Sequence, residues 1–166
     1  LPIFNASKFA LITPPVTPDA DAAPTIEALL PHVTQPLDVS LLTALRDVVE
    51  NATKSFETWD YTRSLELTET FFWAFCDDYI ELVKERANNR DGAFDEAESA
   101  SARAAVRIAL DVLLRLFAPF LPYATEEVWS WWRADSVHRA AWPQADDLPA
   151  FEADTQALGH VGDVLG

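Results

Sequence analysis

The chain has 166 residues, of which 49% are hydrophobic and 23% charged, so it can form one domain with a core and is not a disordered segment. Its formal net charge of −15 argues against a uniformly basic nucleic-acid-binding protein. Its single cysteine, Cys76, excludes an internal disulfide and favours a cytoplasmic protein, and the absence of an apolar run of about 18 residues predicts no membrane span.

The first 36 residues predict a helix followed by a loop. Residues 1–12 have apolar side chains at helical spacing and are interpreted as the end of a linking helix that follows a preceding domain. Residues 13–36 contain six prolines, which exclude one continuous helix and predict a proline-rich loop with room for one turn at residues 25–30. The remaining residues, 37–166, are predicted to form a helical domain that is cut off at its C-terminal end.

Three long helices are predicted in this domain from apolar residues that recur three or four positions apart. They cover residues 37–57, 61–87 and 96–118. The expected buried stripe of the second helix is Tyr61, Leu65, Phe72, Phe75, Tyr79 and Leu82. Lys84 and Arg86 lie near the end of that helix, where we expect them to interact with its dipole.

Two prolines mark the end of the third long helix. Pro119 ends it, and Pro122 suits the first turn of a short helix that stops near Trp132. The side chains predicted to lock this helix pair together are Phe117, Phe120, Tyr123 and Trp129. Residues 135–143 are expected to be extended, and residues 149–164 to form a last, incomplete helix. These elements predict an all-α fold, an antiparallel helical bundle of four to five helices.

Residues that could catalyse a reaction or hold a metal are scattered. His32, His138 and His160 lack the Glu-x-x-His or His-Glu-x-x-His spacing of helical metal sites. The acidic residues 77–78, next to Cys76, are interpreted as a solvated face beside a buried thiol. All four glycines follow position 91, so there is no glycine-rich phosphate loop. We therefore predict no catalytic residue and no metal site.

The positive charges have an uneven distribution. All basic residues except Lys8 lie between Arg46 and Arg139. Because charges are screened over about 8 Å at physiological salt, a local basic patch can act on a chain that is acidic overall. Two interpretations of Arg46, Lys54 and Arg63 stay open: they are cations on a solvated helix face, or they contact RNA phosphates.

Four stretches of the sequence point to a known family. They are NASKFAL at residues 5–11, FFWAFCDDYIELVKER at 71–86, LLRLFAPFLPYATEEVWSWW at 113–132 and SVHRAAWP at 136–143. In this order and spacing they resemble the anticodon-binding domain of valyl-tRNA synthetase, a class I aminoacyl-tRNA synthetase. The motif APFLPYATEEVW also looks like the isoleucyl and leucyl relatives, whereas FCDDYIE and SVHRAAWP favour valine.

The resemblance implies a class I synthetase anticodon-binding domain over residues 37–166 and a parent enzyme that uses ATP and magnesium to join valine to tRNA(Val). Catalytic and editing domains of the same chain are its expected partners. The start at Leu1 and the lack of methionine also predict a piece of a longer protein. Because neither catalytic signature of the family is in this sequence, we expect it to bind and position tRNA without catalysis or a cofactor of its own. The family suggests a monomer.

Individual contacts are predicted from position, since the family motif is incomplete here. Members of the family often carry Asp-Arg-Trp or Asp-Arg-Phe at the start of the helix that matches residues 37–57, whereas residues 38–40 of this chain are Asp-Val-Ser. An aromatic base platform and a phosphate-binding arginine are therefore absent from that position. The predicted tRNA-binding residues are Arg46, Lys54 and Arg63 for the backbone and Trp59 or Tyr61 for stacking on a base.

Other functions stay open on the sequence alone. An acidic protein-interaction bundle without an RNA role agrees with the net charge of −15. A helical metalloenzyme is a third class, and the same domain of an isoleucyl- or leucyl-tRNA synthetase is the nearest rival within the resemblance.

Overall fold

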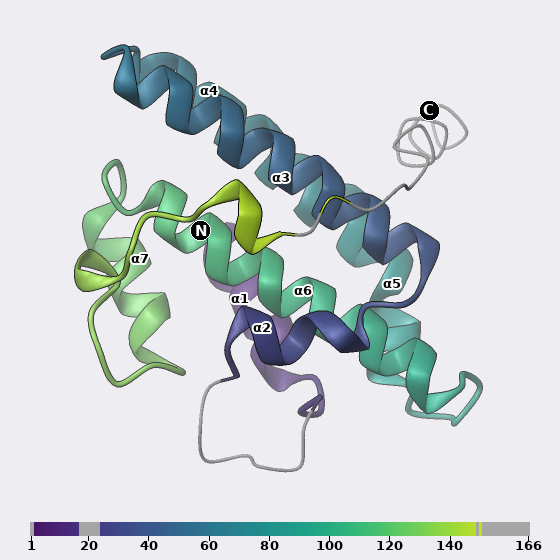
Figure 1. The fold of residues 1–166 in the computed structure, drawn as a ribbon. Helices are drawn as coiled ribbons and strands as arrows, with labels where there is room; N and C mark the ends of the chain where they lie inside the picture. Colours follow the sequence, from purple (N-terminus) through teal and green to yellow (C-terminus); the bar gives the residue numbers. More distant parts are fainter. Residues whose placement is uncertain (1, 17–23, 149, 151–166) are drawn as a thin grey trace.

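A computed structural model describes residues 2–16, 24–148 and 150 of the chain. Within these residues every regular element is helical and no strand occurs, which confirms the predicted all-α bundle (Figure 1). None of the described helices combines the length and apolar character that crossing a bilayer requires. The predicted boundaries at residues 12 and 36 stay a prediction.

The N-terminal elements pack on the rest of the bundle. Helix α1, Pro2–Ile12, lies against the central helix α6, Glu96–Phe117. Helix α2, Ile26–Leu29, continues into the 3-10 turn η1, Leu30–His32, and also packs on α6. Together α2 and η1 fall where the sequence predicts a turn within the proline-rich stretch.

Helices α3, Pro36–Glu57, and α4, Tyr61–Trp73, form a long antiparallel hairpin (Figure 1). Pro36 suits the first position of α3 because its missing N–H has no partner there. At the other end of the hairpin Asp60 caps α4 by accepting a hydrogen bond from the backbone N–H of Arg63. The Asp60 cap therefore fixes the start of α4 at the tip of the hairpin.

The predicted helix 61–87 is present, but its middle is wider than an α-helix. Helix α4 continues through the π-helical segment η2, Ala74–Tyr79, into α5, Ile80–Asn88. Phe72, Phe75 and Tyr79 of the predicted stripe are buried. The predictions for Tyr61 and Leu82 are wrong, because both side chains are exposed.

Helix α6 is the centre of the molecule (Figure 1). It begins with a capping box between Asp95 and Glu98, and residues 101–114 are buried without interruption. Helices α1, α3, α4, α5 and α7 all contact it. Its buried residues are mostly apolar but include Arg103, Arg107 and Asp111.

The proline turn after α6 leads into α7, Pro122–Ser130, as predicted. Phe117 and Trp129 are buried, and Phe120 is half-buried. The prediction for Tyr123 is wrong: its side chain is 91% exposed. The buried face of α7 contains Thr125, Val128 and Trp129, and at about 100° per residue Tyr123 lies on the opposite face.

After α7 the chain returns across the bundle. The expected extended conformation is wrong for Val137–Arg139, which form the 3-10 turn η3. The Glu126 carboxylate fixes the start of this turn, because its Oε2 accepts hydrogen bonds from the Val137 N–H and the Ser136 hydroxyl at 3.0 and 2.9 Å. Residues 140–148, here called the strap, then reach α3 and include the 3-10 turn η4, Ala145–Asp147. The predicted helix 149–164 lies outside the described residues, except for residue 150.

A buried polar network fixes the start of α3. The Asp38 carboxylate is fully buried and accepts hydrogen bonds from Tyr79 Oη at 2.7 Å and Ser101 Oγ at 2.6 Å. Arg86 forms a fork with it, at 2.7 and 2.9 Å. Burial raises the pKa of the Tyr79 hydroxyl well above its usual value, and the Asp38 charge adds to this. The network joins α3, η2, α5 and α6.

Arg86 thus has a different role from the one predicted. We expected it to interact with the helix dipole near the end of α5, but its guanidinium neutralises Asp38 from another helix. Sequence periodicity does not reveal this pair because the two residues are far apart in the chain. Lys84 pairs locally with Glu81 on the surface of the same helix.

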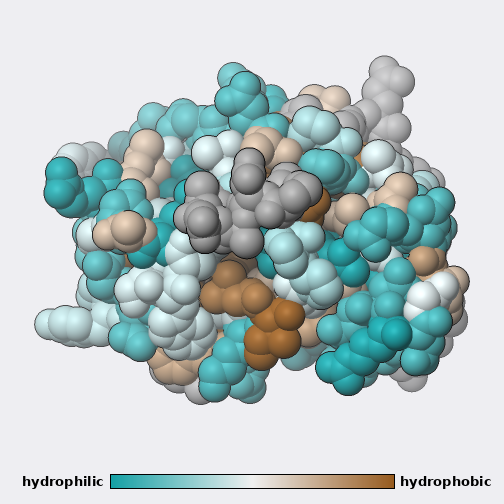
Figure 2. Space-filling model, turned by 90° about the horizontal axis from the view of Figure 1, so that it is seen from below, coloured by the Kyte–Doolittle hydropathy of each residue, from teal (hydrophilic) through white to brown (hydrophobic). Residues whose placement is uncertain are grey.

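Figure 2 shows one face of the molecule, seen from below the view of Figure 1. The described residues on this face are mostly hydrophilic, and some hydrophobic residues gather near its middle.

Candidate nucleic-acid interface

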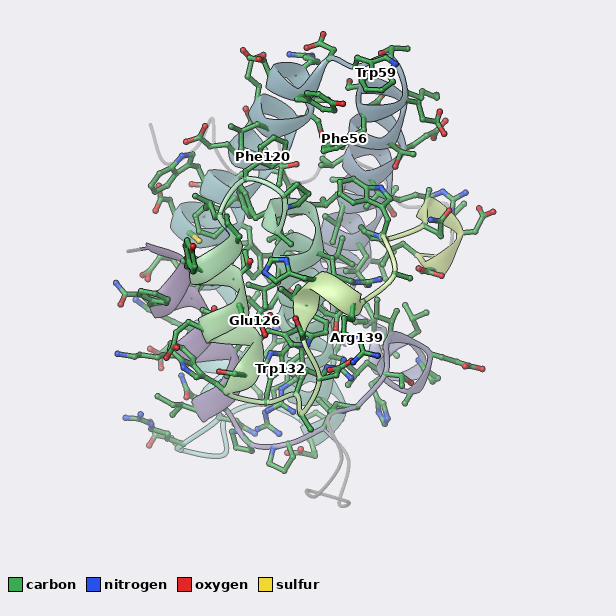
Figure 3. All side chains as sticks on the ribbon, turned by 90° about the vertical axis from the view of Figure 1, so that its left-hand side faces the viewer. Phe56, Trp59, Phe120, Glu126, Trp132 and Arg139 are labelled. Atoms are coloured by element: carbon green, nitrogen blue, oxygen red, sulfur yellow. The ribbon has the colours of Figure 1, made fainter. Side chains whose placement is uncertain are left out.

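The tip of the α3–α4 hairpin displays the two aromatic residues that were predicted to stack on a base. Trp59 is 80% exposed and Tyr61 is 43% exposed. The two rings lie 6.3 Å apart between centroids, and the Tyr61 ring is 4.9 Å from that of Phe56. Figure 3 shows Trp59 at the outer end of the molecule, with Phe56 and Phe120 behind it.

Phe56 connects the exposed rings to a firm support. Its ring centroid lies 5.8 Å from that of Phe120, in the turn after α6, and 5.0 Å from that of Trp142, in the strap. The Trp142 indole N–H donates to Thr53 Oγ1 at 2.9 Å, which fixes the orientation of that ring. Tilted and edge-to-face contacts at these distances are favourable. The tip therefore has three separate elements beneath its exposed rings.

The backbone of Trp59 is in the left-handed region, with φ of 65°. A bulky residue rarely adopts this conformation, because its Cβ crowds the backbone, and the strain costs of order 1–3 kcal/mol. The turn is held by hydrogen bonds from the Trp59 N–H to Phe56 O at 3.1 Å and from the Asp60 N–H to Ser55 O at 2.9 Å. Strain of this kind at an exposed position is typical of functional sites.

This strain gives a stability prediction. We expect Trp59→Gly to be more stable than Trp59→Ala by about 1 kcal/mol, because glycine adopts a positive φ without the Cβ penalty. Urea denaturation of the two variants followed by circular dichroism measures the difference. Both variants lack the indole ring, so the comparison isolates the backbone. Equal midpoints for the two variants would show that the turn is not strained.

Two of the predicted cations lie together beside the tip. Lys54 and Arg63 line a hollow of about 410 Å³ whose other lining residues are Asn51, Ser55, Thr58 and Leu67. Lys54 Nζ is 2.7 Å from Glu50, and Arg63 Nη1 is 3.4 Å from Glu66. Such exposed ion pairs contribute little, so either cation can exchange its carboxylate for a phosphate. The Asn51 amide and the Ser55 and Thr58 hydroxyls of the hollow donate to backbone carbonyls of α3.

Arg46 is not part of this group. Its side chain is 24% exposed, and its Nη1 donates to the carbonyl oxygens of Ala145 and Leu148, both at 2.6 Å. Its Nη2 lies 2.8 Å from Asp146 Oδ1. The structure therefore brings together four of the five predicted residues, Lys54, Trp59, Tyr61 and Arg63, and places Arg46 under the strap.

A second hollow lies elsewhere and has a different character. It measures about 520 Å³ and contains Asp111 between Arg115 and Arg133, at 2.7 and 2.8 Å. Its other ionisable lining residues are all acidic: Glu27, Asp146 and Asp147. Since carboxylates outnumber guanidinium groups, this hollow does not fit a phosphate.

The described residues give little support to covalent catalysis by a cysteine or to metal binding. Burial raises the pKa of the Cys76 thiol to about 12, and the nearby Asp77 charge adds to this, so the thiol stays neutral and is not an activated nucleophile. No group of three or more His, Cys, Asp or Glu residues in this part of the chain is arranged to hold a metal ion.

A helical bundle with exposed rings and cations at one tip fits RNA binding, and sequence comparison agrees. A family model described as the anticodon-binding domain of tRNA ligase matches residues 38–164. The chain belongs to this family. The matched range includes the whole α3–α4 tip and the strap of this anticodon-binding domain.

Three curated relatives of the anticodon-binding domain have the same name. A Valine--tRNA ligase of Cutibacterium acnes is 58% identical over 133 residues, covering 80% of this chain and 15% of the relative. Those of Salinispora tropica and Thermobifida fusca are 51% and 53% identical, and each alignment covers 98% of this chain. The resemblance to valyl-tRNA synthetases is thus confirmed. The chain spans only 15 to 20% of the length of these relatives.

Proposed function

We propose that this domain holds the anticodon arm of tRNA(Val) for a longer valine–tRNA ligase, whose other domains join valine to the tRNA. The observation that carries the proposal is the tip itself, where exposed Trp59 and Tyr61 lie next to the polar, cationic hollow of Lys54 and Arg63. The names of the relatives support valine over isoleucine or leucine as the amino acid.

The chemistry of the tip suits an unpaired RNA loop. Bases of a single-stranded loop can be splayed out and stacked on aromatic rings, and each stacked base is worth about 1–3 kcal/mol. Trp59 and Tyr61 supply such rings. Lys54 and Arg63 then neutralise the phosphates on either side of the stacked base.

The net charge of −15 limits where RNA can bind to this chain. A chain with this charge repels phosphates over most of its surface, so non-specific RNA binding is weak. Binding is then confined to the tip, where cations and rings coincide.

ATP and magnesium belong to the proposed parent enzyme. The described residues contain neither a metal-holding cluster nor a glycine-rich phosphate loop, so they do not fit these groups, and no step of the reaction is assigned to them. The catalytic and editing domains of the same chain are the proposed partners, in a cytoplasmic monomer.

The main test is the salt dependence of tRNA binding. We expect a tRNA(Val) transcript to bind the chain, and Arg63→Ala to lower the slope of log affinity against log salt by about 0.7 to 0.9, because one phosphate contact is lost. Fluorescence anisotropy between 50 and 200 mM salt measures both quantities.

Arg139→Ala is the matched control, because Arg139 is also exposed but lies away from the tip in Figure 3. It should leave the slope unchanged. Equal slopes for wild type and Arg63→Ala would contradict the phosphate contact. No binding to tRNA at the lowest salt would favour the acidic protein-interaction bundle, and equal binding to tRNA(Ile) would remove the choice of valine.

A further inference from the structure

The strap follows one face of α3 from the aromatic tip towards the start of the helix. Arg46, Thr53 and Phe56 are seven and three residues apart, so they lie on the same side of α3. Trp142 of the strap contacts Thr53 and Phe56, and η4 of the strap contacts Arg46. The strap is thus attached at two points along the same helix face.

Arg46 makes the second attachment with both terminal nitrogens of its guanidinium. Nη1 donates to the backbone carbonyls of Ala145 and Leu148, and Nη2 donates to the Asp146 carboxylate, all within 2.8 Å. Leu148, whose carbonyl is one acceptor, has a fully buried side chain and so fixes the end of the strap in the core. A lysine has no fork and cannot hold the same acceptors at once.

The attachment reaches the tip through a continuous series of rings. Trp142 packs on Phe56, Phe56 packs on Tyr61, and the centroid distances are 5.0 and 4.9 Å. Ala145, where Arg46 binds, is three positions after Trp142. A strap that detaches at η4 therefore loosens the ring that supports Phe56 and, through it, Tyr61.

We infer that Arg46 is a positioning residue for tRNA binding: it clamps the strap so that Trp142 supports the aromatic tip, and it does not contact a phosphate. The inference rests on the proposed function and assigns Arg46 a role other than the direct backbone contact predicted from its position. Arg46 is 24% exposed and donates to two backbone carbonyls and a carboxylate of the strap. Lys54 and Arg63 are 64% and 56% exposed, and within the described part of the chain each pairs only with a surface carboxylate of its own helix.

The two roles of Arg46 predict different binding data for tRNA(Val). As a clamp, Arg46→Ala lowers affinity about 2- to 30-fold, the range for residues that act through others, and leaves the salt slope unchanged. As a phosphate contact, Arg46→Ala lowers the slope by about 0.7 to 0.9, and Arg46→Lys keeps most of the affinity. The clamp predicts that Arg46→Lys is as weak as Arg46→Ala.

A double mutant tests the path through Trp142. Because both residues act through the strap, Arg46→Ala combined with Trp142→Ala should reduce affinity no more than Trp142→Ala alone. Fully multiplied losses would mean that Arg46 acts on the RNA by another route, and would overturn the inference. Arg63→Ala is the control. Because Arg63 does not act through the strap, its loss of affinity should multiply with that of Trp142→Ala.

Amide hydrogen exchange gives a readout without RNA. The Leu148 and Asp147 amides donate to Ala145 and Gln144 within η4, so Arg46→Ala should speed their exchange at least tenfold, and Arg139→Ala should not. Unchanged exchange in folded Arg46→Ala overturns the clamp. If the wild-type chain binds no tRNA, the proposed function fails, whereas tRNA binding with a reduced slope in Arg46→Ala overturns only this inference.

Discussion

We expect Asp38→Ala to destabilise the domain by about 3–5 kcal/mol, the largest effect of any single substitution considered. The Asp38 carboxylate is fully buried and accepts hydrogen bonds from Tyr79, Arg86 and Ser101. Removing it leaves the Arg86 guanidinium, which is itself largely buried, without a counter-charge, and leaves two hydroxyl groups without their acceptor. Urea denaturation followed by circular dichroism measures the loss.

Asp47→Ala is the matched control, because Asp47 is an exposed aspartate on the same helix. It should change stability by no more than about 0.5 kcal/mol. Asp38→Asn keeps the shape but not the charge, and we expect an intermediate loss. A loss of less than about 1 kcal/mol for Asp38→Ala would mean that the network does not hold the start of α3 in solution.

The largest effect on binding is expected for Trp59. Trp59→Ala should weaken the binding of a tRNA(Val) transcript by about 1–3 kcal/mol, which is about 5- to 150-fold, because one base loses its stacking surface. Trp59→Phe should retain most of the affinity, since a smaller ring still stacks. Neither change removes a charge, so the salt slope should stay as in the wild type.

Trp131→Ala is the appropriate control for this loss. Trp131 is also an exposed tryptophan, but it packs on Phe4 and donates to Glu127 at the end of α7, away from the tip. Anisotropy titrations with the same transcript should show wild-type affinity for this variant. Equal losses for the two tryptophan variants would indicate a general effect of exposed indoles rather than stacking at the tip.

Much of the fold was accessible from the sequence, because its signals are local. The limits of α3 and α6 follow from apolar residues three or four apart, and Pro36, Pro122 and the capping box at Asp95 mark helix starts. Tyr123 shows where this reasoning ends. An aromatic residue next to a proline turn fits the pattern of a packing residue. The ring of Tyr123 nevertheless faces solvent, because a different face of α7 packs on the bundle.

The candidate site was predictable only in part. Lys54, Trp59, Tyr61 and Arg63 lie within ten positions, so their grouping follows from the helix–turn–helix pattern of the sequence. Their supports do not. Trp142 meets Phe56 across about half of the chain, and the segment SVHRAAWP shows only that its tryptophan needs an apolar partner. Arg46 was predicted as an RNA contact because nothing local reveals that a distant turn supplies its acceptors.

The π-helical segment η2 affects how the buried faces of α4 and α5 line up along the rod that they form. Buried residues recur every four positions in α4, at Ser64, Thr68 and Phe72, and again at Tyr79, Val83 and Ala87. An α-helix with that spacing drifts by about 40° each turn, since each residue advances it by about 100°. The slower winding of η2 cancels much of this drift and keeps both halves in phase. Adding or deleting one residue there would rotate Arg86 away from Asp38 although neither residue is altered.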